Sequence, residues 1–141
     1  MIQASASIDI PASPSDVWRL IGGFNSLPDW LGYIPKSELS EGGRVRHLAN
    51  PKGETIVEQL ERFDNSARTY SYSILKAPFP ITGYLSTLQV KTAADGKGSH
   101  VEWAATFTPD SGVSDEEASK IFQGIFEDGL KELASRFKAK K

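Results

Sequence analysis

The sequence contains no cysteine among its 141 residues, which excludes disulfide bonds, thiolate nucleophiles and cysteine-ligated metals. It has no apolar run of about 18 residues, the length that a membrane-spanning helix requires. Residues 1–10 also lack the basic start and long apolar stretch of a secretory signal. We therefore expect a cytoplasmic protein without a membrane span.

Positive charge is not in excess, because 16 lysines and arginines stand against 18 aspartates and glutamates. A net charge of −2 provides no basic field for phosphates, so nucleic-acid binding is disfavoured. Lys138, Lys140 and Lys141 are expected to form a solvated tail rather than a binding patch. The length and the 39% hydrophobic content are typical of one globular domain, residues 1–141.

Motifs of familiar catalytic and cofactor sites are missing as well. The two histidines, His47 and His100, lie far apart, and no serine-hydrolase, zinc-protease, P-loop or dinucleotide signature occurs. We expect no metal and no cofactor.

Local patterns predict a strand followed by two short helices. Apolar and polar residues alternate over residues 2–10, as in a half-buried strand. Ser13 suits a helix N-cap and Pro14 the first helical position, which predicts a helix over residues 14–22. A second helical turn is expected near residues 25–30.

The middle of the chain has the pattern of a β-meander. Alternating segments between Ile34 and Val90 are separated by turn signals at residues 41–43, 50–53 and 64–66. A last strand, residues 100–108, follows a turn at residues 95–98. Together with the first strand this predicts seven strands with antiparallel neighbours.

The C-terminal segment predicts a long amphipathic helix. Ser114 and Glu117 are spaced as a capping box, and apolar residues follow at helical spacing as far as Phe137. Some 23 residues would span roughly 35 Å, enough to cross a small sheet. The expected fold class is α+β: a curved seven-stranded antiparallel sheet wrapped on this helix, with space for a cavity between them.

This order of elements resembles the START-like superfamily, the helix-grip fold of birch-pollen-allergen-like proteins, and in particular its bacterial polyketide cyclase/dehydrase and lipid-transport members. The resemblance covers essentially the whole chain and rests on residues 10–18, 27–30, 57–61, 68–74, 83–88 and 129–133. It implies a helix-grip fold, but its motifs specify chemistry poorly, because the family includes receptors, carriers and cyclases.

The direction of the strand side chains follows from periodicity and from the resemblance. Periodicity buries Val101, Trp103, Ala105 and Phe107 and turns His100 outward. The resemblance implies that three further sets face inward: Tyr84, Ser86, Leu88 and Val90; Tyr72 and Ile74; Ile56, Glu58 and Leu60.

Glu58 is the most informative residue of these sets. A carboxylate in an apolar phase costs several kcal/mol to bury alone, so it needs a partner, water or a raised pKa. The resemblance implies a polar network beside a ligand. The structural alternative is that Glu58 pairs with an arginine or a tyrosine hydroxyl, or lies at the rim of the sheet.

The candidate ligand site combines Glu58 with aromatic and hydroxyl side chains. Its predicted members are Trp30, Glu58, Tyr72, Phe79, Tyr84, Ser86, Trp103, Phe122 and Phe126. Residues 49–53 and 76–81 are the candidate entrance loops, and Pro78 and Pro80 stiffen the second around Phe79. Gly124, in the middle of the predicted helix, indicates room for close approach.

Three functions stay open at this point. The first is binding or transport of a small hydrophobic molecule: a lipid, a polyketide or an aromatic compound. The second is a cofactor-free cyclase, dehydratase or isomerase in which Glu58 is the general acid or base. The third is a protein-interaction module with a filled interior. The sequence leaves the oligomeric state open.

Overall fold

The sheet is the largest element of the fold, as seen in a computed structural model that describes residues 1–137. Its seven antiparallel strands have the order β1-β7-β6-β5-β4-β3-β2. The strands are β1 (Ile2–Ile10), β2 (Lys36–Ser40), β3 (Val45–Ala49), β4 (Thr55–Asp64), β5 (Thr69–Lys76), β6 (Ile81–Thr92) and β7 (Ser99–Pro109). The prediction of a first strand and a six-stranded meander is confirmed, and the predicted lysine tail lies outside the described residues.

The first and the last helix begin at the predicted caps. They are α1 (Pro14–Ile21), α2 (Leu27–Trp30) and α3 (Asp115–Ser135), with one 3₁₀ turn, η1 (Glu41–Gly43). Ser13 Oγ accepts a hydrogen bond from the Asp16 amide at 3.2 Å, and Ser114 Oγ accepts one from the Glu117 amide at 3.0 Å. α3 ends before the predicted Phe137, because the Phe137 amide bonds to the Ala134 carbonyl in a tighter final turn.

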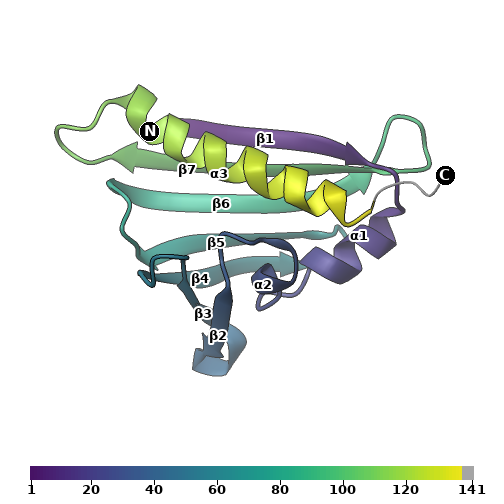
Figure 1. Cartoon of the computed structure of the whole chain (residues 1–141), viewed down its shortest axis with the longest axis horizontal. Coiled ribbons are helices and arrows are strands. Elements are labelled where there is room, and N and C mark those ends of the chain that lie inside the picture. The colour runs from purple at the N-terminus through teal and green to yellow at the C-terminus, as the bar shows by residue number, and fades with distance from the viewer. Residues whose placement is uncertain (138–141) are drawn as a thin grey trace.

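α3 covers one face of the sheet and leaves the other face open. Figure 1 shows α3 lying across β1, β7 and β6, while α1 and α2 lie below the C-terminal half of α3. The short strands β2 and β3 turn steeply away from the direction of β6 and β7. Irregular registers between Leu60 and Arg62 on β4, and between Thr82 and Leu85 on β6, are bulges of the kind that bend strands. The expected helix-grip arrangement is confirmed.

The inner face of the sheet is the predicted one. Val101, Trp103, Ala105 and Phe107 on β7 are at most 3% exposed. Tyr84, Ser86, Leu88 and Val90 on β6 are also buried. His100 points outward, with Nδ1 2.6 Å from Asp9 Oδ1 on β1.

Aromatic contacts hold α3 against this face. Phe126 stacks on Trp103 with ring centroids 4.5 Å apart, and Phe122 lies 4.8 Å from Phe107 and 5.0 Å from Tyr84. Ring pairs at such distances add to the free energy gained by burying their area. The contact between helix and sheet therefore depends on a few large side chains.

The two glycines of α3 predict opposite effects on stability. A Cβ at Gly129 would lie 2.8 Å from Leu31 Cδ1 and 2.9 Å from Trp103 Cζ3, whereas a Cβ at Gly124 meets nothing within 4 Å. We expect Gly129→Ala to lower the free energy of unfolding by about 1–3 kcal/mol through overpacking. Gly124→Ala should raise it by up to about 1 kcal/mol through helix propensity. Urea unfolding of both variants measures the difference, and equal effects would contradict this account.

Candidate ligand cavity

A cavity of about 40 Å³ lies between α3 and the middle of the sheet. It is lined by Leu27, Leu31, Tyr33, Ile34, Leu48, Ile56, Glu58, Tyr72, Ile74, Phe79, Tyr84, Trp103, Phe122, Ile125 and Phe126. A volume of this size holds about one to three water molecules. The interior of this state is therefore close to filled.

Most of the predicted site residues lie together around this cavity. Those that line it are Glu58, Tyr72, Phe79, Tyr84, Trp103, Phe122 and Phe126. Trp30 and Ser86 do not line it, although both are buried at 0% exposure. Sequence reasoning missed the aliphatic part of the lining, such as Leu31 and Ile125, because those residues have the ordinary pattern of a core.

Ser86 and Trp30 instead contact Trp103, which itself lines the cavity. Trp103 Nε1 donates to Tyr72 Oη at 3.1 Å and to Ser86 Oγ at 3.2 Å, and Ser86 Oγ donates to the Ala104 carbonyl at 3.0 Å. The Trp30 ring packs on Trp103 with centroids 5.6 Å apart. Both predicted residues therefore position Trp103.

Glu58 forms a buried ion pair with Arg46, which is 0% exposed. Arg46 Nε donates to Glu58 Oε1 at 2.8 Å, and Nη2 lies 2.7 Å from the same oxygen without hydrogen-bond alignment. The two residues are directly opposite each other on β3 and β4. The predicted structural role of Glu58, pairing with an arginine, is thus present.

The remaining surroundings of Arg46 are aromatic rings and a backbone carbonyl. Its Nη1 donates to the Phe24 carbonyl at 2.8 Å and reaches Tyr70 Oη at 3.4 Å. Its Cζ lies 4.2 Å from the Phe24 ring centroid and 4.6 Å from that of Tyr72. Cation–π contacts of this kind stabilise a desolvated cation. Arg46 was not predicted from the sequence. It stands two residues before Leu48 on β3, and residues two apart on a strand face the same side of the sheet.

Burial shifts the pKa values of the ionisable groups at the cavity. Burial raises the pKa of Glu58 above its ordinary value, and the neighbouring Arg46 opposes that rise. Burial alone would lower the pKa of Arg46, but Glu58, Tyr70 and Tyr72 outweigh it, so the net shift is upward. An arginine stays charged in proteins, and ionised Glu58 balances that charge. Burial also raises the pKa of the Tyr72 and Tyr84 hydroxyls, which keep their protons.

Two parts of the cavity lining, here called its walls, are shared with hollows on the surface. Ile74, Phe79 and Tyr84 line both the cavity and an outer hollow of about 340 Å³ beside residues 74–84. Leu31, Tyr33 and Ile125 line both the cavity and a second hollow of about 340 Å³ along α3. No residue of the expected 49–53 entrance lines the cavity, so this prediction was wrong. Asn50 instead forms hydrogen bonds with Lys52 and Glu54 within the loop.

Within residues 1–137, one hydrogen bond ties the second wall to α3. The Gly32 amide, beside Leu31 and Tyr33, donates to Glu132 Oε2 at 2.7 Å.

Within residues 1–137, no group of three or more His, Asp or Glu side chains is placed to hold a metal ion. None of the helices in that range combines the length and apolar character needed to pass through a lipid bilayer.

The helix-grip architecture places this chain in the class of START-superfamily folds. A START superfamily protein from Mycobacterium smegmatis has a TM-score of 0.77 over 96% of each chain, and its 12% identity indicates the fold alone. The family model for polyketide cyclase/dehydrase and lipid transport matches residues 1–138. The chain belongs to that family.

Two structures from bacilli are much more similar to it. An uncharacterized protein from Bacillus thuringiensis is 59% identical, with a TM-score of 0.94 over 96% of this chain and 98% of that one. XoxI from Bacillus cereus is 60% identical, with a TM-score of 0.94 over 97% of this chain and 96% of that one.

The ion pair predicts a strongly non-additive double mutant. Arg46→Met or Glu58→Met alone should lower the free energy of unfolding by about 3–5 kcal/mol, because each leaves one buried charge unbalanced. The double variant should be no less stable than either single one. Urea unfolding of all four proteins gives the coupling energy. The exposed pair Lys91–Glu102, 2.8 Å apart, is the control and should show coupling of about 0–1 kcal/mol; additive losses at Arg46 and Glu58 would contradict the prediction.

Proposed function

We propose that this protein binds a small hydrophobic molecule in the cavity between α3 and the sheet. The observation that carries the proposal is one carboxylate, Glu58, in an otherwise apolar and aromatic lining. Sites for small molecules combine an apolar wall with few polar groups in this way. Membership of a family described by polyketide cyclase/dehydrase and lipid transport supports the same conclusion.

Binding requires the walls of the cavity to move, because a cavity of about 40 Å³ has room only for water. Phe79 lies between β5 and β6 on a loop, whereas Ile74 and Tyr84, its partners in the wall, lie on strands. Phe79 is half-buried and touches Phe122 edge-on at 5.1 Å. Rotation of this ring would join the cavity to the outer hollow, and a ligand would stabilise that open state.

The cyclase, dehydratase or isomerase reading is the second candidate, with Glu58 as general acid or base. A general base works best with a pKa near the operating pH and a free path to the substrate proton. Arg46 contacts Oε1 and opposes the rise in the pKa of Glu58, which favours binding over proton transfer. The third candidate is a protein-interaction module. The observation that supports it is the nearly filled interior.

Phe79→Ala tests the proposed entrance with N-phenyl-1-naphthylamine, a hydrophobic dye that fluoresces in apolar surroundings. We expect saturable fluorescence with the wild-type protein. The variant should bind the dye about three- to tenfold faster, because the open state is more populated. Stopped-flow fluorescence measures the rate.

Leu85→Ala is the matched control, since Leu85 is 45% exposed and lines no cavity wall. Its binding rate should equal that of the wild-type protein. Absence of saturable fluorescence from the wild-type protein and from Phe79→Ala would refute the proposal and favour the interaction module. Turnover of polyketides by the wild-type protein, lost in Arg46→Met/Glu58→Met, would favour the enzyme.

A further inference from the structure

The second hollow extends the apolar surface of the candidate cavity along α3. Leu31, Tyr33 and Ile125 line both spaces, so the two are neighbours. The hollow has a volume of about 340 Å³, against about 40 Å³ for the cavity. Ile121 and Ile125, one turn apart on α3, line the hollow and are only half-buried. The hollow therefore offers apolar room that the cavity lacks.

The shape of this hollow favours a linear chain over a compact ring system. Its lining follows α3 from Ile121 to Glu132, which is roughly 16 Å of helix. Gly124 lies within this stretch, and a Cβ there would meet nothing within 4 Å. Glycine is less favourable than alanine inside a helix, and its lack of a side chain leaves this part of the hollow open.

Two carboxylates give the hollow its charge. Asp128 and Glu132 line it one helical turn apart, and none of its lining residues is lysine, arginine or histidine. Glu132 Oε2 accepts the Gly32 amide, but within residues 1–137 neither carboxylate forms an ion pair. Like charges at this spacing repel each other on a helix. A cation bound between them would remove that repulsion.

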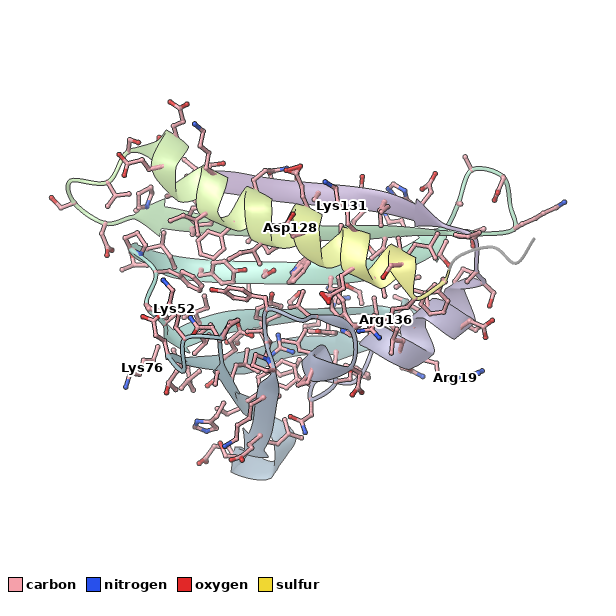
Figure 2. The ribbon with its side chains drawn as sticks, viewed as in Figure 1. Arg19, Lys52, Lys76, Asp128, Lys131 and Arg136 are labelled. Carbon is pink, nitrogen blue, oxygen red and sulfur yellow. The ribbon has the colours of Figure 1, made fainter. Side chains whose placement is uncertain are left out.

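The neighbouring cations of α3 face other parts of the molecule. Lys131 lines a different hollow, together with Ala6 and Ile8 of β1, and Figure 2 shows it on the side of α3 nearer to β1. Arg136 lines a hollow beside α1, together with Arg19. Asp128 and Glu132 therefore give the second hollow a negative charge that its own lining does not balance.

We propose that the ligand of this protein is a linear amphiphile with a cationic head group. Its alkyl chain lies in the cavity and in the second hollow, passing Tyr33 and Ile125, and its head group lies between Asp128 and Glu132. An anionic head group would be repelled by both carboxylates, and an uncharged one would gain no Coulomb attraction from them. This inference rests on the proposed function and names the class of ligand.

Three compounds with the same chain test the inference on the wild-type protein: decylamine, 1-decanol and decanoate. Each competes with N-phenyl-1-naphthylamine, and the loss of dye fluorescence gives the dissociation constants. Near neutral pH decylamine is a cation and decanoate an anion. We expect decylamine to bind at least about tenfold more tightly than decanoate, because two attractions replace two repulsions. Added salt should narrow the difference, since Asp128 and Glu132 both reach solvent.

The variant Asp128→Asn/Glu132→Gln removes both charges and nearly keeps the shape. Glutamine retains an oxygen that can accept the Gly32 amide, so the second wall keeps its bond. Decylamine should bind this variant about three- to tenfold more weakly than the wild-type protein, and decanoate about three- to tenfold more tightly. The affinity for 1-decanol should change by less than about twofold, because the alcohol carries no charge.

Glu116→Gln/Glu127→Gln is the matched control, because it changes the net charge by the same amount on the same helix. Neither residue lines the cavity or the second hollow. Its affinities for the three compounds should stay within about twofold of the wild-type values, since screened surface charges act weakly at a distance. An equal loss of decylamine binding in this control would show a general effect of net charge and overturn the proposed site.

Gly124→Leu tests the path of the chain, because leucine is a good helix former whose side chain would fill the hollow. This variant should bind decylamine about tenfold more weakly, while the affinity for the dye, which occupies the cavity, changes by less than about twofold. Gly124→Ala adds only one methyl group and should lose less than about threefold. Urea unfolding checks that both variants are folded.

The outcomes separate this inference from the proposed function. If decanoate binds the wild-type protein as tightly as decylamine, the cationic site is wrong and the hydrophobic cavity stands. If calorimetry detects decylamine binding that leaves the dye in place, or if Gly124→Leu binds decylamine as the wild-type protein does, the path from hollow to cavity is wrong. If neither the dye nor any of the three compounds binds, the proposed function itself fails.

Discussion

The buried ion pair between Arg46 and Glu58 connects the parts of the fold that surround the cavity. It joins β3 to β4, and through the Phe24 carbonyl it ties both strands to the segment between α1 and α2. The rings of Phe24, Tyr70 and Tyr72 pack around the guanidinium. A buried charge that loses its partner destabilises a fold strongly, so these elements must close around the pair together. The same pair presents one fixed carboxylate oxygen to the cavity.

The aromatic side chains that stabilise the fold also line the candidate cavity, and this explains why the cavity is small. Phe122 packs against Phe79, Tyr84 and Phe107, so it holds α3 to the sheet while lining the cavity. An apolar cavity large enough for a ligand but left dry would forfeit these contacts. A nearly filled interior preserves them, and under the proposed function a ligand would supply replacements. In this molecule the core and the candidate site are the same set of rings.

Periodicity and capping predicted most of the fold, because both depend on neighbours in the sequence. Ser13 and Ser114 cap helices as expected, and the phase of β7 was correct at every inward position. The site was harder to predict, since it depends on register. The sequence marked Glu58 as needing a partner, but only the alignment of β3 with β4 identifies Arg46. Likewise, nothing local distinguishes Tyr33 as a wall residue, or Ser86 as a support behind Trp103.

The bond between Gly32 and Glu132 has a consequence for how such a protein can evolve. The bond is exposed, and an exposed hydrogen bond contributes about 0.5–1.5 kcal/mol, enough to bias a wall toward closure without locking it. A Cβ at position 32 would lie 2.7 Å from Glu132 Oε1, so any side chain there displaces the carboxylate. Neither Gly32 nor Glu132 lines the cavity. Under the proposed function, selection could therefore tune how long a ligand stays by changing residues that do not line the cavity.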